Sequence, residues 1–335
     1  MLLKIINQNS FVIFLLINIR ILIINVMSNV KNILKKPLSF IINFLLKSFN
    51  IFVIYRIGAA IGDQVCMTAV IRLINEQYPY KIVVISSYPE IFYNNPRVWK
   101  FFGVNGRGIY LSRILRFLSG AQLENFLFKD DKLSYVNYMR EFGDNLHLVQ
   151  AQAMHFSHNI DFKEILNEIY FSKDELKIFR QQFKLPSSFS LINPLGKDTY
   201  TSNKKWGFEN FQHVVKFSDK INWIQVGLPN DKELLGVENF YNSITLRELF
   251  YLTSQAKFVL AEEGLINHIS SAFKTKSYVL HSGFSQVSLP HYKNTVLISN
   301  HSACEFAPCW KLEECGVKNK PCIFGITPNK VIEII

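Results

Sequence analysis

From residue 51 onward, short apolar runs alternate with segments whose apolar residues recur every three or four positions. Ile51–Tyr55 is a β-rich run of the kind found in buried strands, and Ile82–Ser86 is a second. Between them lie a glycine-bearing turn, Arg56–Asp63, and a helical pattern over Gln64–Gln77. A strand, a helix and a second strand within about 35 residues form a βαβ unit, so the pattern predicts a parallel sheet.

A second alternating series begins near residue 188. It predicts strands at Phe189–Asn193, Trp223–Val226, Phe258–Ala261, Tyr278–His281 and Thr295–Ile298, and helices at Phe208–Phe217, Leu246–Ser254 and Leu265–Phe273. The stretch between the two series is less regular and suggests helices around residues 112–142 and 160–184. The two series predict an α/β protein with two Rossmann-like domains facing a cleft, over residues 51–187 and 188–303. Ligands of such sheets bind at the carboxyl ends of the strands.

The first fifty residues form a hydrophobic and amphipathic extension. Residues 11–28 are apolar over about the length of one bilayer crossing, with Arg20 near the centre. Residues 29–49 place apolar side chains at steps of three and four, with lysines on the other face, which predicts a basic amphipathic helix. We expect this extension to associate with a membrane. The other interpretations are an ordinary surface helix packed on the protein, and a chain that starts at Met27.

Composition and charge narrow the function classes. The chain has 335 residues, of which 49% are hydrophobic and 5 are cysteines, and this excludes a disordered chain and a disulfide-dense scaffold. Its net charge is +11, but over half of that excess lies in the first fifty residues, which contain no acidic residue. An acid-free apolar segment suits an anionic membrane surface rather than nucleic acid. If residues 11–28 span a bilayer, Lys31, Lys35 and Lys36 place the rest of the chain in the cytoplasm.

The turn after the first strand carries the first candidate site. From Gly58 to Asp63 it reads GAAIGD, which is neither the GxGxxG dinucleotide fingerprint nor a phosphate-binding P-loop. It ends in a carboxylate where a helix begins. Asp63 is therefore either a general base at the carboxyl end of the strand or an N-cap of the helix.

Two further motifs lie in the second series. A polar loop containing Gly196, Thr199 and Lys204 runs to a predicted helix, and such a loop either holds a diphosphate or is simply solvated surface. Glu263, Gly264 and His268 follow the strand Phe258–Ala261 and open a helix. Carboxylates accept hydrogen bonds from ribose hydroxyls, although a capped helix with a buried histidine has the same pattern.

Taken in this order, the three motifs resemble those of the family 9 glycosyltransferases, the bacterial heptosyltransferases of lipopolysaccharide core assembly. The resemblance covers residues 51–300. The matching positions are Ile61-Gly62-Asp63 with Thr68, Asn193-Pro194-Leu195-Gly196 with Lys204-Lys205-Trp206 and Glu209-Asn210-Phe211, Thr245–Leu249, and Glu263 with His268 and Ser271-Ala272. The chain departs from the family at Ala69, where the motif has proline. It also has Glu263 in place of aspartate, with Gly264 directly after it.

The resemblance implies a GT-B fold and an inverting transfer of a sugar from a nucleotide-activated donor, such as ADP-heptose, to a lipid-linked saccharide. It makes Asp63 the base that deprotonates the acceptor hydroxyl and Lys204 the lysine that binds donor phosphate. Glu263 and His268 match the donor-binding motif, and the implied donor site also contains Gly62, Gly196, Thr199 and Gly264. No metal cofactor is required if a lysine offsets the charge that grows on the leaving diphosphate.

Four of the five cysteines lie in the C-terminal segment 304–335, at Cys304, Cys309, Cys315 and Cys322. Four thiolates can hold a structural Zn or Fe ion, although their spacing is wider than in common zinc sites. The other interpretation is that they are reduced, unligated thiols of a cytoplasmic protein.

The sequence as a whole predicts a membrane-peripheral glycosyltransferase at the cytoplasmic face of the bacterial inner membrane. Two alternatives remain open. One is a non-catalytic scaffold that binds saccharides or nucleotide-sugars on the same fold, and the other is a related transferase that acts on a protein acceptor.

Overall fold

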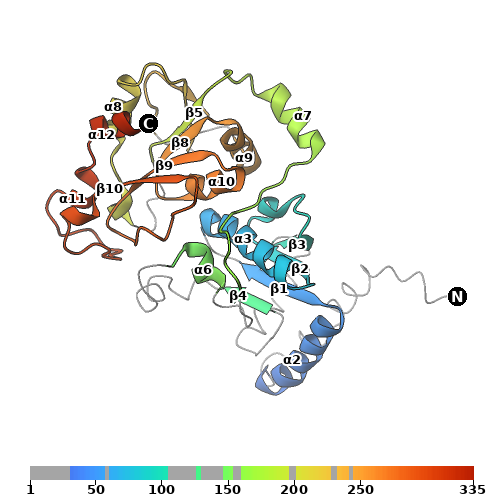
Figure 1. Ribbon diagram of the computed structural model, residues 1–335. Coiled ribbons are helices and arrows are strands. Elements are labelled where there is room, and N and C mark those ends of the chain that lie inside the picture. The colour runs from blue at the N-terminus through green and yellow to red at the C-terminus, as the bar shows by residue number, and fades with distance from the viewer. Residues whose placement is uncertain are drawn as a thin grey trace.

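The computed structural model (Figure 1) describes residues 31–56, 60–104, 126–129, 146–153, 160–195, 201–227, 232–240 and 244–335. The predicted apolar segment 11–28 lies outside these residues, as do the loop positions Gly196 and Thr199. Among the described residues, no helix combines the length and apolarity needed to cross a bilayer.

A four-stranded parallel sheet forms the N-terminal domain, with the order β3-β2-β1-β4. Its elements are α2 (Lys31–Ser48), β1 (Ile51–Arg56), α3 (Ile61–Gln77), β2 (Lys81–Ser86), the short 3₁₀ helix η2 (Pro89–Phe92), β3 (Val98–Gly103), β4 (Phe126–Lys129) and α6 (Leu148–Ala153). The residues of β1 are all buried, because α3 covers one face of the sheet and α2 packs on the other. This burial on both faces explains why β1 is apolar along nearly its whole length.

A six-stranded sheet forms the C-terminal domain, with the order β10-β9-β8-β5-β6-β7 and parallel pairing throughout. Its strands are β5 (Ser190–Asn193), β6 (Trp223–Gln225), β7 (Glu238–Asn239), β8 (Phe258–Glu262), β9 (Lys276–His281) and β10 (Thr295–Ser299). Its helices are α7 (Lys173–Gln182), η3 (Ser202–Lys204), α8 (Phe208–Lys216), α9 (Leu246–Gln255), α10 (Leu265–Phe273), η4 (His301–Ala303), α11 (Pro321–Phe324) and α12 (Pro328–Ile334). Numbered within each sheet, the strands follow the doubly wound order 3-2-1-4 and 3-2-1-4-5-6, which confirms the predicted α/β class.

In the stretch between the two series the prediction is confirmed only in part: α7 (Lys173–Gln182) lies within the helical region predicted around 160–184. Most of the region around 112–142, which was expected to be helical, lies outside the described residues. Its described part, residues 126–129, is the strand β4, which pairs with β1. Residues 160–172 were also expected to be helical, and they run as an irregular linker. Ile160, Phe162 and Ile165 of this linker pack against the core, so their spacing reflects burial rather than a helical turn.

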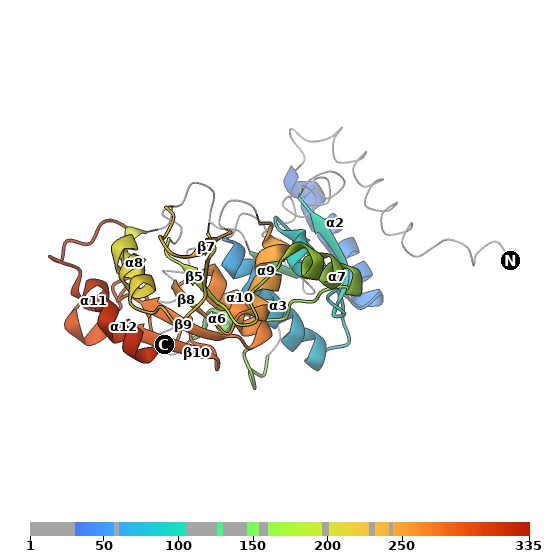
Figure 2. The same ribbon diagram turned by 90° about the horizontal axis from the view of Figure 1, so that it is seen from above.

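The two domains meet through α3 and α10, which lie side by side in Figures 1 and 2. One hydrophobic cluster spans the contact. It joins Val65 and Ile71 of α3 to Phe250, Ile269 and Phe284 of the C-terminal domain. The domains are therefore held by a packed apolar interface at this end of the molecule.

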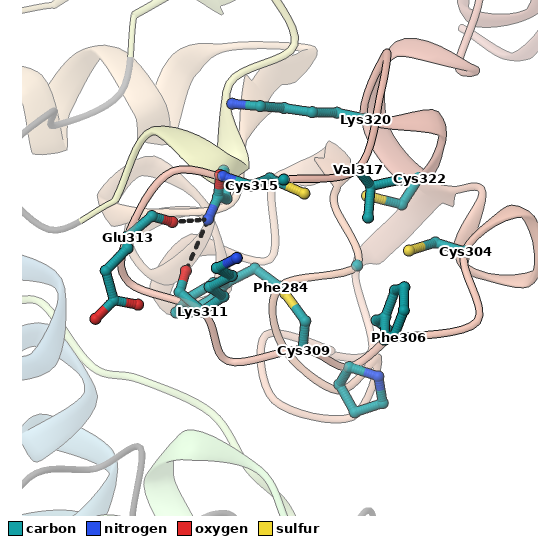
Figure 3. Close-up of a pocket in the computed structure, with 14 residues that line it drawn as sticks. Phe284, Cys304, Phe306, Cys309, Lys311, Glu313, Cys315, Val317, Lys320 and Cys322 are labelled. Atoms are coloured by element: carbon teal, nitrogen blue, oxygen red, sulfur yellow. Dashed lines mark hydrogen bonds between the residues drawn. The ribbon is translucent and has the colours of Figure 1, made fainter.

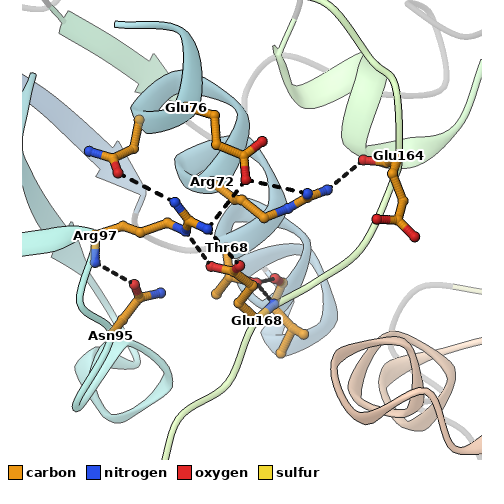
Figure 4. Close-up of polar contacts among 9 residues, drawn as sticks. Thr68, Arg72, Glu76, Asn95, Arg97, Glu164 and Glu168 are labelled. Atoms are coloured by element: carbon orange, nitrogen blue, oxygen red, sulfur yellow. Dashed lines mark hydrogen bonds and ion pairs between the residues drawn. The ribbon is translucent and has the colours of Figure 1, made fainter. Parts of the chain in front are cut away.

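Charged side chains hold the linker against α3 (Figure 4). Arg97 donates hydrogen bonds to both carboxylate oxygens of Glu168, at 2.8 and 3.3 Å, and also pairs with Glu76. Arg72 donates to the main-chain oxygen of Glu164, and Thr68 Oγ1 accepts from the Glu168 amide at 2.9 Å. The linker thus follows α3 in one defined path before it enters the C-terminal domain.

Arg247 of α9 links the C-terminal domain to both the linker and the N-terminal domain. Its nearly buried guanidinium donates to the Glu175 carboxylate and to the main-chain oxygens of Tyr170 and Glu90. Burial alone would raise the pKa of Glu175, but its hydrogen bonds with Arg247 and Ser172 lower the pKa below its ordinary value. The relative position of the domains therefore depends on a specific polar contact as well as on apolar packing.

Candidate functional site

Two of the predicted site residues, Asp63 and Glu263, lie at the switch points of the two sheets. In each sheet the strand order reverses between the first and fourth strands, which are β1 and β4 in one sheet and β5 and β8 in the other. Asp63 follows the carboxyl end of β1, and Glu263 follows the carboxyl end of β8. Ligands of doubly wound sheets bind at these places, so the fold puts the candidate residues where a binding site is expected.

Asp63 lies in the first turn of α3 and does not cap it. The N-cap residue is Ala60, which makes no side-chain hydrogen bond, so Asp63 is not the N-cap. Asp63 Oδ2 lies 3.2 Å from Nη2 of Arg56, the last residue of β1, and Gln152 Nε2 donates to the Asp63 main-chain oxygen at 2.9 Å. The Arg56 side chain is 1% exposed and that of Asp63 is 22% exposed. The buried arginine therefore orients a carboxylate that solvent can still reach.

Gly62 is in direct contact with the third motif. A Cβ atom at this position would lie 2.9 Å from Cδ2 of His268 and 3.5 Å from the Cα of Leu265. Glycine is needed here because α3 and α10 approach too closely for a larger residue. Gly62 was predicted to be a donor-binding residue, and the structure places it against the predicted donor-binding histidine.

His268 is part of a buried polar group. Its Nδ1 lies 2.8 Å from the hydroxyl of Tyr292, which also accepts a hydrogen bond from Asn167 and lies 3.2 Å from Cys66 Sγ. Burial lowers the pKa of His268 to about 4, although the Glu263 carboxylate acts in the other direction. Burial also raises the pKa values of the Cys66 thiol and the Tyr292 hydroxyl. These groups are therefore neutral at pH 7.

Glu263 and Lys204 form the charged part of the site. Lys204 Nζ lies 2.7 Å from Glu263 Oε1, and Ser285 donates to Oε2 at 3.0 Å. Burial by itself would raise the pKa of Glu263, but Lys204 and the hydrogen bonds outweigh it and lower this pKa to about 2. His281 Nε2 is 3.3 Å from the other carboxylate oxygen, and burial lowers the pKa of His281 to about 4. His281 is thus a neutral neighbour, whereas Lys204 and Glu263 form an ion pair.

Among the described residues, the start of α10 is open. Gly264 is its N-cap, and within this part of the chain a Cβ atom there would meet no atom nearer than the Glu262 carbonyl oxygen at 4.0 Å. Its backbone is extended, so the conformation does not itself require glycine. The helix N-terminus beside Lys204 and Glu263 therefore has room for an anionic or hydroxyl-bearing group.

Sequence reasoning missed several residues of the site. Arg56 was detectable, because a charged residue that ends a buried strand needs a partner, and the next carboxylate along the chain is Asp63. Tyr292 and His281 gave no such signal, since only the fold brings them to His268 and Glu263.

The four C-terminal cysteines line one cavity of about 550 Å³ in the C-terminal domain (Figure 3). Asn203, which precedes Lys204, holds the cavity wall. It donates to the main-chain oxygens of Lys311 and Glu313 and accepts from the Cys315 amide at 3.1 Å. Burial raises the pKa of Cys322, and the other three thiols add to the effect. Among the described residues, however, no three His, Cys, Asp or Glu side chains are arranged to hold one metal ion.

The ion pair at Glu263 predicts a pH-dependent stability. Its pKa of about 2 lies below the ordinary value of 4.5, so the fold favours the ionised form. The resulting stabilisation is complete above pH 4.5 and is lost as the pH falls towards 2. We expect Glu263→Gln to lower the free energy of unfolding at pH 7, by an amount that shrinks below pH 4.5 in urea titrations. Glu238→Gln, at an exposed carboxylate, is the control, and an equal loss at pH 3 and pH 7 would contradict the prediction.

The close approach at Gly62 predicts a coupling between two positions. Gly62→Ala should cost about 1–3 kcal/mol of unfolding free energy, because the added methyl group meets the His268 ring. In a His268→Ala background the ring is gone and the cost should be smaller. Urea unfolding of both single variants and the double variant measures the difference. Equal costs in the two backgrounds would show that the contact is not the cause.

A scan of protein-family models found no match, and a search of curated proteins also found none. Solved structures do share the fold. A family 9 glycosyl transferase from Veillonella parvula has 13% identity and a TM-score of 0.59, and the alignment covers 84% of this chain and 95% of that one. Escherichia coli ADP-heptose lipopolysaccharide heptosyltransferase II has 14% identity and a TM-score of 0.55, with 84% and 97% covered.

A third similar structure is that of TibC from enterotoxigenic E. coli, an iron-containing dodecameric heptosyltransferase solved in complex with ADP-D-β-D-heptose. It has 12% identity and a TM-score of 0.56 and covers 85% of this chain and 76% of its own. At such identities the likeness shows the fold. The chain therefore has the GT-B fold of the family 9 glycosyltransferases and heptosyltransferases, as the sequence motifs implied.

Proposed function

We propose that this protein is an inverting glycosyltransferase that moves a sugar, with heptose from ADP-heptose as the first candidate, onto a saccharide hydroxyl. One observation carries the proposal. The motifs around Asp63, Lys204 and Glu263, which are far apart in the sequence, form one connected site through the contacts Gly62–His268 and Lys204–Glu263. The solved structures with this fold include heptosyltransferases, one of them bound to ADP-heptose, which supports the choice of donor.

In the proposed reaction, the acceptor oxygen forms a bond to C1 of the donor sugar while the bond from C1 to the diphosphate oxygen breaks. Asp63 takes the proton of the acceptor hydroxyl, and its contact with Arg56 holds the carboxylate in place for that step. The diphosphate leaves with the bonding electron pair. Attack on the face opposite the leaving group inverts the configuration at C1.

Lys204 stabilises the negative charge that grows on the departing diphosphate. Glu263 anchors the lysine ammonium at the start of α10, and Phe284 lies under it, with its ring centroid 4.8 Å from Nζ. A fixed ammonium at this place supplies the positive charge without a metal ion. His268, neutral at pH 7, contributes hydrogen bonding rather than charge.

The acceptor is proposed to be a lipid-linked saccharide of the lipopolysaccharide core. A protein side-chain hydroxyl is the second candidate, because the same base and the same donor site would serve it. The catalytic residues do not discriminate between the two acceptors, so the choice rests on product analysis.

The base assignment predicts the effect of Asp63→Asn. This variant should bind ADP-heptose as the wild type does, because Asp63 acts on the acceptor, while its turnover falls by a factor of about 10²–10⁴. Calorimetric titration with ADP-heptose, UDP-sugars and GDP-sugars measures binding, and release of ADP in the presence of lipid-linked core saccharide measures turnover. Asp219→Asn, at an exposed aspartate of the C-terminal domain, is the matched control.

Other outcomes identify the alternatives. If the wild-type protein binds a nucleotide-sugar but transfers no sugar to any saccharide or protein acceptor, the result supports the non-catalytic scaffold. Full turnover by folded Asp63→Asn would remove Asp63 as the base while leaving the transferase in place. Preference for a UDP- or GDP-sugar would change the donor and keep the mechanism.

The Zn or Fe ion predicted at the C-terminal cysteines is a separate proposal, and no step of the reaction depends on it. Cys304, Cys309, Cys315 and Cys322 share a cavity, but in the described arrangement they do not ligate one ion. A bound ion would require the loop 304–322 to draw the four sulfurs together. We expect protein expressed with added zinc or iron to contain one metal ion per chain. The Cys309→Ser and Cys315→Ser variants should lose the metal, and the Cys66→Ser variant should keep it. Metal-free wild type would refute the proposal.

A further inference from the structure

Helix α2 turns its largest apolar side chains away from the protein. Ser39 and Ile42 are buried, and Leu46 packs against the apolar cluster of the sheet that includes Ile51 and Val53. The outward side carries exposed rings and one aliphatic chain, followed by Phe49 just after the helix: Phe40 is 75%, Phe44 62%, Ile41 50% and Phe49 45% exposed. We call Phe40, Ile41, Phe44, Lys47 and Phe49 the α2 face. The helical spacing put Ile41 and Ile42 on one apolar stripe, but the structure buries Ile42 and exposes Ile41.

A tryptophan and two lysines continue the α2 face onto the sheet. The Lys81 amide donates to the Asn50 main-chain oxygen at 2.7 Å, which puts the start of β2 beside the end of α2. The ammonium of Lys81 lies 5.7 Å from the centroid of the Trp99 ring, and that of Lys100 lies 6.0 Å from it. Trp99 also packs against the same apolar cluster as Leu46. Aromatic rings and lysines therefore lie together on this side of the N-terminal domain.

The charge of this region has one sign. The chain has no acidic residue before Asp63, and α2 itself contains Lys31, Lys35, Lys36 and Lys47. Clustered exposed apolar side chains in a folded protein mark a surface that another molecule covers. Phenylalanine and tryptophan rings beside lysines match the layered chemistry of a bilayer surface, where acyl chains lie beneath anionic headgroups. A protein that binds the α2 face would need a groove that is both apolar and negatively charged. An anionic bilayer has apolar acyl chains and negative headgroups and needs no such groove.

We propose that the α2 face is a docking surface for an anionic lipid bilayer, on which the helix lies flat. Phe40, Ile41 and Phe44 enter the boundary between headgroups and acyl chains, and the lysines contact the headgroup phosphates. In Figure 1, α2 projects from the lower edge of the N-terminal domain, away from the C-terminal domain. The proposal does not rest on sugar transfer, so it can stand or fail independently of the proposed function.

Vesicle binding by the full-length chain tests the proposal. Wild-type protein should co-sediment with vesicles of phosphatidylcholine and phosphatidylglycerol, and far less with pure phosphatidylcholine. Binding should weaken as NaCl rises from 0.1 to 1 M, because salt screens the lysines. Phe40→Ser together with Phe44→Ser should weaken partitioning at least about tenfold, since two rings no longer enter the lipid. Phe217→Ser is the matched control, because Phe217 is 56% exposed and lies beside Lys216 but belongs to the C-terminal domain.

A second measurement separates the α2 face from residues 1–30, which could bind lipid on their own. Phe44→Trp and Phe217→Trp place a fluorophore on the α2 face and on the control site. Vesicles of brominated phosphatidylglycerol should quench the added emission of the first variant and leave that of the second unchanged. Binding without quenching at position 44 would overturn the proposal, and so would equal binding to neutral vesicles. Self-association would also overturn the proposal. It would appear as a dimer in light scattering that Phe40→Ser and Phe44→Ser convert to a monomer, with no binding of the wild type to vesicles.

Discussion

The contact between α3 and α10 is the constraint on which the candidate site depends. Each helix begins at the carboxyl end of a strand beside a switch point, so the contact between the two helices brings together the edges of both sheets at which doubly wound folds bind their ligands. A glycine at position 62 permits the approach, because any side chain there would meet the His268 ring. The apolar cluster around these two helices packs the contact. The hydrogen bonds of Arg247 add a second, polar connection between the domains.

This close packing determines which groups of the site carry charge. His268, Tyr292 and Cys66 are buried without a charged partner close enough to outweigh burial, so each stays neutral at pH 7. Glu263 is equally enclosed but remains ionised, because Lys204 lies 2.7 Å away. The result is a neutral polar centre between two ion pairs, Arg56–Asp63 and Lys204–Glu263. Such an arrangement separates a carboxylate that can accept a proton from an ammonium that can meet a diphosphate.

The sequence predicted those parts of the fold that local pattern encodes. The helix Leu265–Phe273 was predicted with its exact bounds. Its apolar spacing matches the face that is buried in the structure, and the preceding glycine is its N-cap. The strand β4 was missed, because four residues are too few for periodicity to distinguish a strand from a helix. The positions of Tyr292 and His281 in the site could not be predicted from the sequence, because only the folded arrangement of the strands brings them to His268 and Glu263. The outward turn of Phe40 and Phe44 was also missed, because helical spacing identifies a stripe but not the side that the sheet will cover.

The side chains of β1 alternate between two apolar clusters, and this alternation shows that α2 contributes to the core as well as to the surface. Phe52 and Ile54 face the cluster around α3, whereas Ile51, Val53 and Tyr55 face the cluster to which Leu46 of α2 contributes. Without α2, this second face of the sheet would lose part of its apolar cover. A bilayer that binds the outer side of folded α2 would therefore stabilise the helix that covers β1, by mass action on the folded state. Because α3 covers the opposite face of the same strand, docking through α2 would leave α3 on the side of the sheet away from the lipid.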